Sequence, residues 1–137
     1  YYGDEIGLSA GDDPACRGAF PWQDETTWSQ ELLAAYRQAT AMRHRYPVLR
    51  TGAFAPLYAQ GSVYGFSRKS GAQEAIALFN TDTTAASVVL ETTGLTSTRF
   101  TRVWPEAPKA AHIVEHGRLT LTIPAREAVV LMSSEED

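Results

Sequence analysis

Apolar residues between Thr27 and Tyr46 recur at spacings of three and four positions. The residues that share this spacing are Trp28, Leu32, Tyr36, Ala39, Met42 and Tyr46. Such a spacing lays one apolar stripe along an α-helix. Thr26 or Thr27 can cap its N-terminus, and Pro47 can end it because proline lacks a backbone N–H. The pattern therefore predicts a helix over about residues 27–46.

After Pro47 the period of the pattern changes to two. Short segments rich in β-branched and aromatic residues follow at 56–60, 62–68, 74–80, 86–91, 99–104, 111–115, 118–123 and 127–133. The alternation is clearest where Leu119, Leu121 and Ile123 point to one side and the intervening threonines to the other. Short strands separated by frequent turns are typical of antiparallel sandwiches. We therefore expect a mainly β fold, an antiparallel two-sheet β-sandwich of about seven or eight strands in Greek-key-like order.

The first 24 residues have no regular period. Four glycines and two prolines interrupt them, which predicts an irregular loop. Ordered loops of this length are uncommon in a small domain, and they usually carry function. The chain is thus expected to consist of an irregular loop, one helix and a sandwich.

Composition narrows the possible partners. The chain has 137 residues and a net charge of -4, so it lacks the basic surface that nucleic acids or anionic membranes require. No apolar run reaches the roughly 18 to 20 residues that cross a bilayer. The single cysteine, Cys16, excludes an internal disulfide and fits a reducing compartment, so we expect a cytoplasmic protein. Neutral sugars remain possible partners.

Acidic residues of the loop are candidates for glycosidase chemistry, which needs two carboxyl groups about 5 to 10 Å apart. Asp4, Glu5, Asp12 and Asp13 have the right type, but spacing alone does not place them. Acids in a glycine-rich loop more often form turns or caps. Calcium is a second option, although the order of the acids does not match an EF-hand loop.

Other side chains give weaker signals. His112 and His116 would lie roughly 13 Å apart on an extended strand, which is too far to share one metal ion. Cys16 has no histidine base beside it in the sequence and is best explained as a passive side chain. We therefore expect no metal site, no cofactor and no catalytic residue from the patterns alone.

Aromatic residues gather where the loop approaches the helix. Trp22 and Trp28 lie close in sequence to Phe20 and to Arg17. Aromatic faces contact the apolar face of a sugar, and charged side chains bind its hydroxyls. The alternative is a hydrophobic staple over the start of the helix. We favour the staple for Trp28, which falls on the helical stripe, and both interpretations stay open for Trp22.

Three stretches in order, YYGDEIGL, GDDPACRGAFPW and MRHRYPVLRTGAF, resemble the α-amylase family of glycoside hydrolases (family 13). The resemblance is strongest to its neopullulanase, cyclomaltodextrinase and maltogenic amylase branch. The chain departs from the family pattern at two positions. Ala15 stands where family members often have an acidic residue, and Gly18 stands where they usually have a larger residue. The resemblance implies that residues 1–50 are the end of a catalytic (β/α)8 barrel, namely its last loop and final helix. Residues 51–137 would be the C-terminal β-sandwich domain.

The resemblance also implies a function. A parent enzyme would hydrolyse α-1,4 or α-1,6 linkages of maltooligosaccharides, cyclodextrins or pullulan with retention, and calcium is possible there. Asp13 and Arg17 fall where family members bind glucose hydroxyls, and Trp22 joins them as a candidate substrate-binding residue. The family's catalytic carboxylates lie on barrel strands that would precede Tyr1. The chain alone is therefore expected to be inactive, with a structural role.

Two alternatives follow from the same residues. The sandwich could be a stand-alone carbohydrate-binding or protein-interaction module, for which Tyr58, Tyr64 and Trp104 are the candidate aromatic residues. Separately, apolar residues that a barrel would cover could join two copies in a homodimer. Those residues are Tyr1, Tyr2, Ile6, Leu8, Phe20 and the helical stripe.

Overall fold

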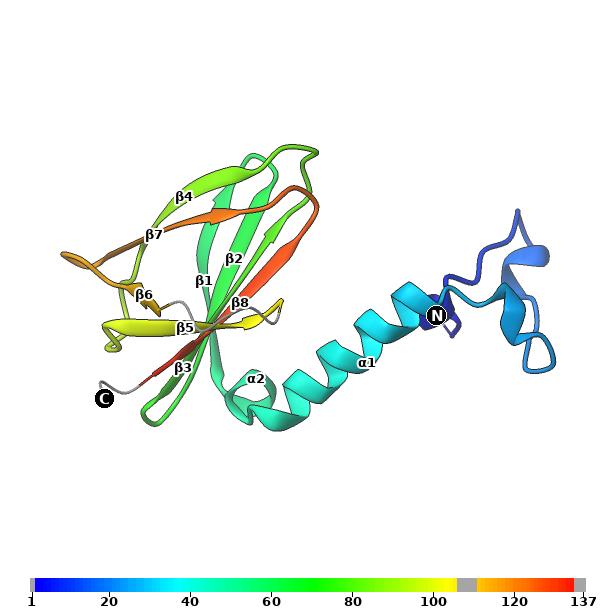
Figure 1. The fold of residues 1–137 in the computed structure, drawn as a ribbon, viewed down its shortest axis with the longest axis horizontal. Coiled ribbons are helices and arrows are strands. Elements are labelled where there is room, and N and C mark those ends of the chain that lie inside the picture. Colours follow the sequence, from blue (N-terminus) through cyan, green and yellow to red (C-terminus); the bar gives the residue numbers. More distant parts are fainter. Residues whose placement is uncertain (1, 106–110, 135–137) are drawn as a thin grey trace. The chain divides into compact units, whose positions relative to one another are not determined.

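The computed structural model describes residues 2–105 and 111–134 (Figure 1). The chain divides into two compact units, Tyr1–Arg45 and Tyr46–Asp137. The predicted boundary between residues 50 and 51 lies inside the second unit. Tyr1, which we named as a possible dimer contact, lies outside the described residues.

The first unit contains three 3-10 turns, η1 (Asp4–Ile6), η2 (Ala15–Arg17) and η3 (Glu25–Thr27), followed by helix α1 (Gln30–Arg45). The long loop and the single main helix match the prediction, but the helix begins three residues late. Ser29 caps it: its Oγ accepts the N–H of Leu32 at 3.3 Å and its carbonyl that of Leu33. Thr26 and Thr27 were the wrong caps, because their hydroxyls bind Asp24 instead.

The start of the loop is folded against the start of α1. Gly3 has a φ of 92°, and the N–H of Ser29 donates to the carbonyl of Ile6 at 2.9 Å. Ile6 is consequently buried, at 3% exposure. The expectation that Ile6 would be an uncovered apolar residue is wrong, whereas Tyr2 and Leu8 are exposed.

The second unit begins with a short helix, α2 (Val48–Thr51), and continues in eight described strands. The strands are β1 (Ala53–Gln60), β2 (Val63–Ser70), β3 (Gln73–Asn80), β4 (Ala86–Glu91), β5 (Arg99–Trp104), β6 (Ala111–Ile113), β7 (Arg118–Ile123) and β8 (Ala128–Ser133). All eight predicted segments form strands. The sequence did not predict α2, since a single turn is too short for a helical period to appear.

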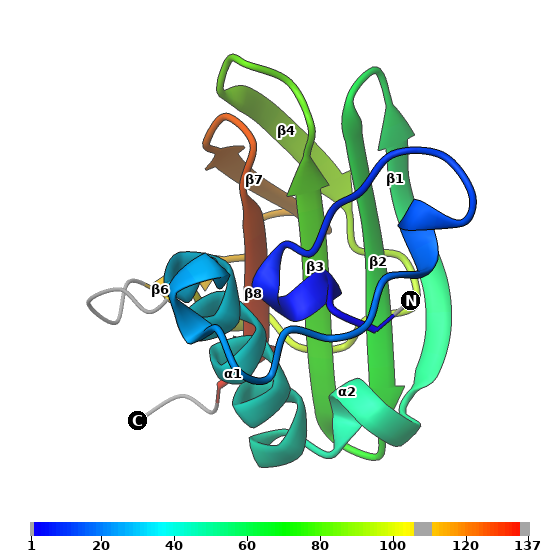
Figure 2. The same cartoon turned by 90° about the vertical axis from the view of Figure 1, so that its right-hand side faces the viewer.

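Two antiparallel sheets form the sandwich, which confirms the predicted fold class. One sheet has the order β1-β2-β3-β8-β5-β6, and β4 pairs with β7 in the other. Figure 2 shows β1, β2, β3 and β8 side by side in one sheet, and β4 and β7 belong to the other. The chain changes sheets four times, between β3 and β4, β4 and β5, β6 and β7, and β7 and β8.

The turn between β6 and β7 connects the two sheets. His116 and Gly117 have φ values of 51° and 76°, as the two central residues of a type I′ turn require. Glu115 and Arg118 exchange backbone hydrogen bonds of 2.9 Å across it. The turn is therefore tight, but it joins strands of different sheets, and the printed pairing across it is the single bridge between Glu115 and Arg118.

The core lies between the sheets and is made mainly by alternate residues of β3, β4, β7 and β8. It consists of Val63, Ile76, Leu78, Val88, Leu90, Phe100, Leu119, Leu121, Ile123, Val129 and Leu131. Gly65 faces this core, and a Cβ there would lie 2.4 Å from Cδ2 of Leu78. A side chain at position 65 would therefore occupy space that Leu78 already fills.

One buried amide orders the loops at one end of the sandwich. The Nδ2 of Asn80 donates to the carbonyls of Thr84 at 2.8 Å and Pro124 at 3.1 Å, and its Oδ1 accepts the N–H of Asp82 at 3.0 Å. Asn80 is 2% exposed. Its side chain thus joins the β3–β4 connection to the β7–β8 connection.

Candidate functional site

Asp13 and Arg17 form an ion pair on the surface of the first unit. The Nε of Arg17 lies 3.2 Å from Oδ1 of Asp13, and the two side chains are 73% and 70% exposed. The backbone turns between Asp13 and the end of η2, and residues four apart can meet across one such turn. The pair offers carboxylate acceptors and guanidinium donors side by side, a combination that suits sugar hydroxyls.

A hydrogen bond holds the loop around this pair. The hydroxyl of Tyr2 donates to the carbonyl of Gly18 at 2.9 Å, which ties the start of the loop to the residue after η2. Cys16 lies between the charged residues in sequence, and its Sγ is 3.9 Å from Oδ1 of Asp13.

Trp22 belongs to a cluster of three aromatic rings. Its ring centroid lies 4.3 Å from that of Phe20 and 6.5 Å from that of Trp28. The Nε1 of Trp28 donates to the carbonyl of Pro21 at 3.2 Å, which fixes the backbone beside Trp22. Trp22 nevertheless remains 71% exposed. The cluster both packs at the start of the helix, as a staple would, and presents an indole to solvent.

The placement of Trp28 differs from the prediction. It lies in extended backbone, two residues before α1 begins, and not on the helical stripe. The three predicted binding residues therefore form two groups in the first unit. Asp13 pairs with Arg17, whereas Trp22 contacts Phe20 and Trp28.

Other titratable residues that the sequence offered as candidates make contacts within the protein. Oε2 of Glu5 accepts the N–H of Gly3 at 3.1 Å. His112 is half-buried, and burial, with a smaller contribution from the charge of Arg102, lowers its pKa. Within residues 2–105 and 111–134, no three His, Cys, Asp or Glu side chains lie close enough to hold a metal ion.

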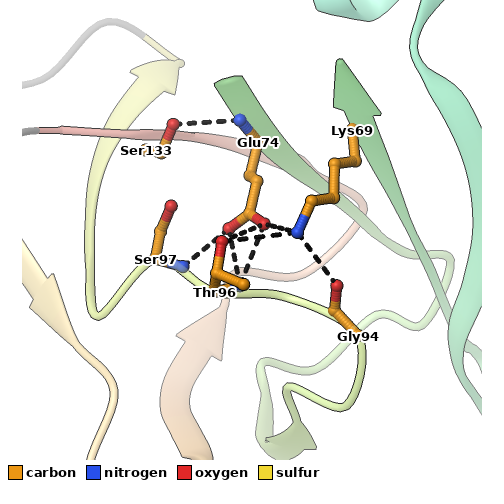
Figure 3. Close-up of polar contacts among 6 residues, drawn as sticks. All are labelled: Lys69, Glu74, Gly94, Thr96, Ser97 and Ser133. Atoms are coloured by element: carbon orange, nitrogen blue, oxygen red, sulfur yellow. Dashed lines mark hydrogen bonds and ion pairs between the residues drawn. The ribbon is translucent and has the colours of Figure 1, made fainter. Parts of the chain in front are cut away.

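Sequence reasoning missed a buried charge in the sandwich. Glu74, the second residue of β3, is fully buried, and Figure 3 shows its carboxylate surrounded by donors. Lys69 Nζ lies 2.6 Å from Oε1. The N–H groups of Thr96 and Ser97 lie 2.9 Å and 2.8 Å from the carboxylate oxygens, and the Thr96 hydroxyl donates at 3.0 Å.

The protonation of Glu74 follows from these contacts. Burial alone would raise the pKa of its carboxyl group, but the hydrogen bonds from Lys69, Ser97 and Thr96 outweigh burial. They lower the pKa from 4.5 to about 2. A signal was present in the sequence, since Glu74 shares the core-facing parity of Ile76 and Leu78. The carboxylate of Glu74 thus holds the β4–β5 connection to the β2–β3 hairpin. Both of its oxygens accept hydrogen bonds from the protein itself, so they are not available to bind a substrate.

Comparison with known proteins decides the family. No model of a protein family matches the chain. An amylopullulanase from Thermoanaerobacterium saccharolyticum is 30% identical over 146 residues, 98% of this chain and 11% of that protein. A cyclomaltodextrinase from a Bacillus species is 45% identical over 60 residues, 44% of this chain and 11% of that protein. The solved structure of a debranching enzyme from Nostoc punctiforme superimposes with a TM-score of 0.81 at 38% identity. The chain belongs to the α-amylase family of glycoside hydrolases.

Its match is to the C-terminal domain of that family. The chain spans 8% and 11% of the amylopullulanases that it matches and 27% of the debranching enzyme, which itself covers 96% of this chain. The family resemblance of the three sequence stretches is thereby confirmed. None of the described helices is long and apolar enough to cross a membrane.

Proposed function

We propose that this chain is the C-terminal part of a retaining α-glucan hydrolase that cleaves α-1,4 or α-1,6 linkages. Residues 1–50 would be the end of its catalytic barrel and residues 51–137 its C-terminal sandwich. The observation that carries the proposal is the match of nearly the whole chain to about a quarter of a debranching enzyme. The names of the other relatives, amylopullulanase and cyclomaltodextrinase, support a glucan substrate.

In this proposal the loop of the first unit forms one side of the substrate site. Active sites of (β/α)8 barrels lie in the loops at the C-terminal ends of the strands. Asp13 would accept hydrogen bonds from glucose hydroxyls and Arg17 would donate them, which their exposed, paired geometry allows. The exposed indole of Trp22 would contact the apolar face of a glucose ring.

The chain by itself would be inactive. Retaining hydrolysis needs a carboxylate nucleophile and a carboxylic acid about 5 to 5.5 Å apart, and the resemblance places both before Tyr1. The contribution of residues 51–137 would be to stabilise the barrel.

A stand-alone carbohydrate-binding module is the second candidate function. Tyr64, one of its predicted aromatic residues, is 43% exposed, whereas Tyr58 and Trp104 are partly buried. Isothermal titration of the chain with maltoheptaose separates the two candidates. Binding to the sandwich would favour the module, and no binding would favour the structural role.

The test of the main proposal uses the full-length enzyme. Asp13→Ala and Arg17→Ala should each raise KM for maltooligosaccharides at least about tenfold, because each removes a charge-assisted hydrogen bond. Trp22→Ala should raise KM roughly threefold to tenfold. Asp12→Ala is the matched control, since it removes an equal charge one position earlier. Kinetics of Asp13→Ala and Arg17→Ala that match those of Asp12→Ala would contradict the assignment.

A further inference from the structure

The side chain of Tyr2 attaches the η2 turn to the beginning of the loop. Its hydroxyl donates to the carbonyl of Gly18 at 2.9 Å and lies 3.5 Å from the carbonyl of Arg17. We propose that Tyr2 is a positioning residue, whose hydroxyl holds η2 in the place where the paired side chains of Asp13 and Arg17 bind a glucan. This inference rests on the function proposed above. It gives a role to a residue that acts on the sugar only through η2.

The η2 turn has its own hydrogen bonds but no buried side chain. The N–H groups of Ala15, Arg17 and Gly18 donate to the carbonyls three positions before them, at 2.8 to 3.0 Å. These bonds determine the shape of the turn. None of the residues of η2 is buried, so apolar packing does not determine where the turn lies. Its position must come from contacts with other segments.

Tyr2 provides the hydrogen bonds that connect this stretch to the rest of the first unit. In the part of the chain that the structure describes, residues 9–19 otherwise make hydrogen bonds and ion pairs only among themselves. The two acceptors of the Tyr2 hydroxyl, the carbonyls of Arg17 and Gly18, lie at the end of η2. Removing this hydroxyl would therefore leave the turn intact but free to move relative to the residues around Tyr2.

The segment that carries Tyr2 is itself well anchored. The N–H of Gly3 donates to Oε2 of Glu5 at 3.1 Å, and the carbonyl of Gly3 accepts the N–H of Ile6 at 3.1 Å. Ile6 is buried, and its carbonyl accepts the N–H of Ser29, the residue that caps α1. Tyr2 thus extends from a turn held against the start of the helix. It can transmit that fixed position to η2.

A fixed η2 turn favours substrate binding through preorganisation. The side chains of Asp13 and Arg17 are 70% and 73% exposed, so a mobile turn would have to be ordered each time that a sugar binds. Ordering a mobile segment on binding costs affinity. Loss of the Tyr2 hydroxyl should therefore weaken substrate binding although every group that contacts the sugar is still present. Uniform loss of binding raises KM and leaves kcat unchanged.

The experiment removes one oxygen atom from the full-length enzyme. Tyr2→Phe should raise KM for maltooligosaccharides about threefold to tenfold, the effect of one neutral hydrogen bond, with kcat and the unfolding temperature as in the wild type. Tyr36→Phe is the matched control, because Tyr36 lies on α1 and is 44% exposed, against 46% for Tyr2. It should leave KM unchanged. In an enzyme that already carries Asp13→Ala and Arg17→Ala, Tyr2→Phe should change KM by less than about twofold, because the side chains that it positions are absent.

Three results would overturn the inference. The first is a KM for Tyr2→Phe equal to that of Tyr36→Phe. The second is an undiminished KM increase when Asp13→Ala and Arg17→Ala are already present, which would mean that Tyr2 contacts the sugar directly. The third is a lowered unfolding temperature with a matching loss of kcat, which would assign Tyr2 a purely structural role.

These failures are distinguishable from a failure of the proposed function. If only the inference is wrong, Asp13→Ala and Arg17→Ala still raise KM. If Asp13→Ala and Arg17→Ala instead behave like Asp12→Ala, the binding role of η2 is refuted, and the positioning role of Tyr2 is refuted with it.

Discussion

The ammonium group of Lys69 lies 2.6 Å from a carboxylate oxygen of Glu74, and only the lysine of the two has contact with solvent. Lys69 also donates to the carbonyl of Gly94 at 3.3 Å. The pair therefore connects the ends of β2 and β3 to the segment between β4 and β5. Removing one member of such a pair leaves a charge or a set of donors without its partner.

Glu74→Gln should lower the free energy of unfolding by about 3 kcal/mol, since breaking a buried ion pair costs of that order. Urea denaturation measures the change. Glu91→Gln is the control: Glu91 lies 2.8 Å from Arg118, but both side chains are more than half exposed. The control should lower the free energy of unfolding by no more than about 1 kcal/mol, because exposed ion pairs contribute little to stability. Equal costs would mean that burial does not determine the contribution of Glu74.

The same carboxylate predicts how stability depends on pH. Its pKa is about 2 in the folded protein and 4.5 ordinarily, so its contribution is complete above pH 4.5 and is lost as the pH falls towards 2. The difference corresponds to about 3 kcal/mol. The stability gap between wild type and Glu74→Gln should shrink across this window. A gap that stays constant from pH 5 to pH 2 would contradict the lowered pKa.

Gly65→Ala should destabilise the sandwich by about 1 to 3 kcal/mol, because the new methyl group overlaps buried Leu78. Thermal unfolding measures the loss. Gly11→Ala is a suitable control, since a Cβ there meets nothing within 4 Å and its backbone is not in the left-handed region. If Gly65→Ala unfolds at the wild-type temperature, Leu78 has more room than the structure gives it.

Asn80→Asp should cost at least about 2 kcal/mol at neutral pH. The change replaces an amide donor by a carboxylate oxygen that faces the carbonyls of Thr84 and Pro124. Gln73→Glu, an equivalent change at an exposed position of β3, should cost little. Chemical denaturation of the two variants makes the comparison. Similar denaturation midpoints would show that the side chain of Asn80 does not stabilise the two connections that it joins.

The first unit should promote self-association of the chain, as predicted from the sequence. Tyr2, Leu8 and Tyr36 are 46%, 37% and 44% exposed, and Trp22 more so. Such apolar groups favour association in water. Light scattering at increasing concentration should detect a dimer that Tyr36→Ser weakens. A monomer at every concentration would refute this prediction.

The sequence predicted the sandwich well because its segments are short, rich in β-branched residues and separated by turns, and because some of them alternate clearly. Residues 118–123 show this best, with Leu119, Leu121 and Ile123 buried and the threonines exposed. The predicted start of the helix was wrong because several residues suited to capping lie close together in sequence, and the hydrogen bond from the N–H of Ser29 to the carbonyl of Ile6 favours Ser29 over the others. The spacing of apolar residues along the helix carries no information about that contact.

Sequence reasoning found contacts between residues close in the chain but missed contacts between distant ones, for a similar reason. Asp13 and Arg17 are four residues apart, so one turn of backbone suffices to pair them. Glu74 and Thr96 are 22 residues apart, and their contact depends on the order of strands in two sheets. The rings of Phe54, Phe66 and Phe79 likewise come from three strands, and they become neighbours only through the register of β1, β2 and β3.

Strand β8 has a consequence for the order in which this protein can fold during synthesis. It is the last described strand along the chain, yet it lies in the middle of its sheet, between β3 and β5. While residues 128–133 are still inside the ribosome, β1-β2-β3 and β5-β6 have no strand to join them. Until residues 128–133 emerge, Ile76, Leu78 and Phe100 therefore lack the neighbours that β8 provides in the folded sheet.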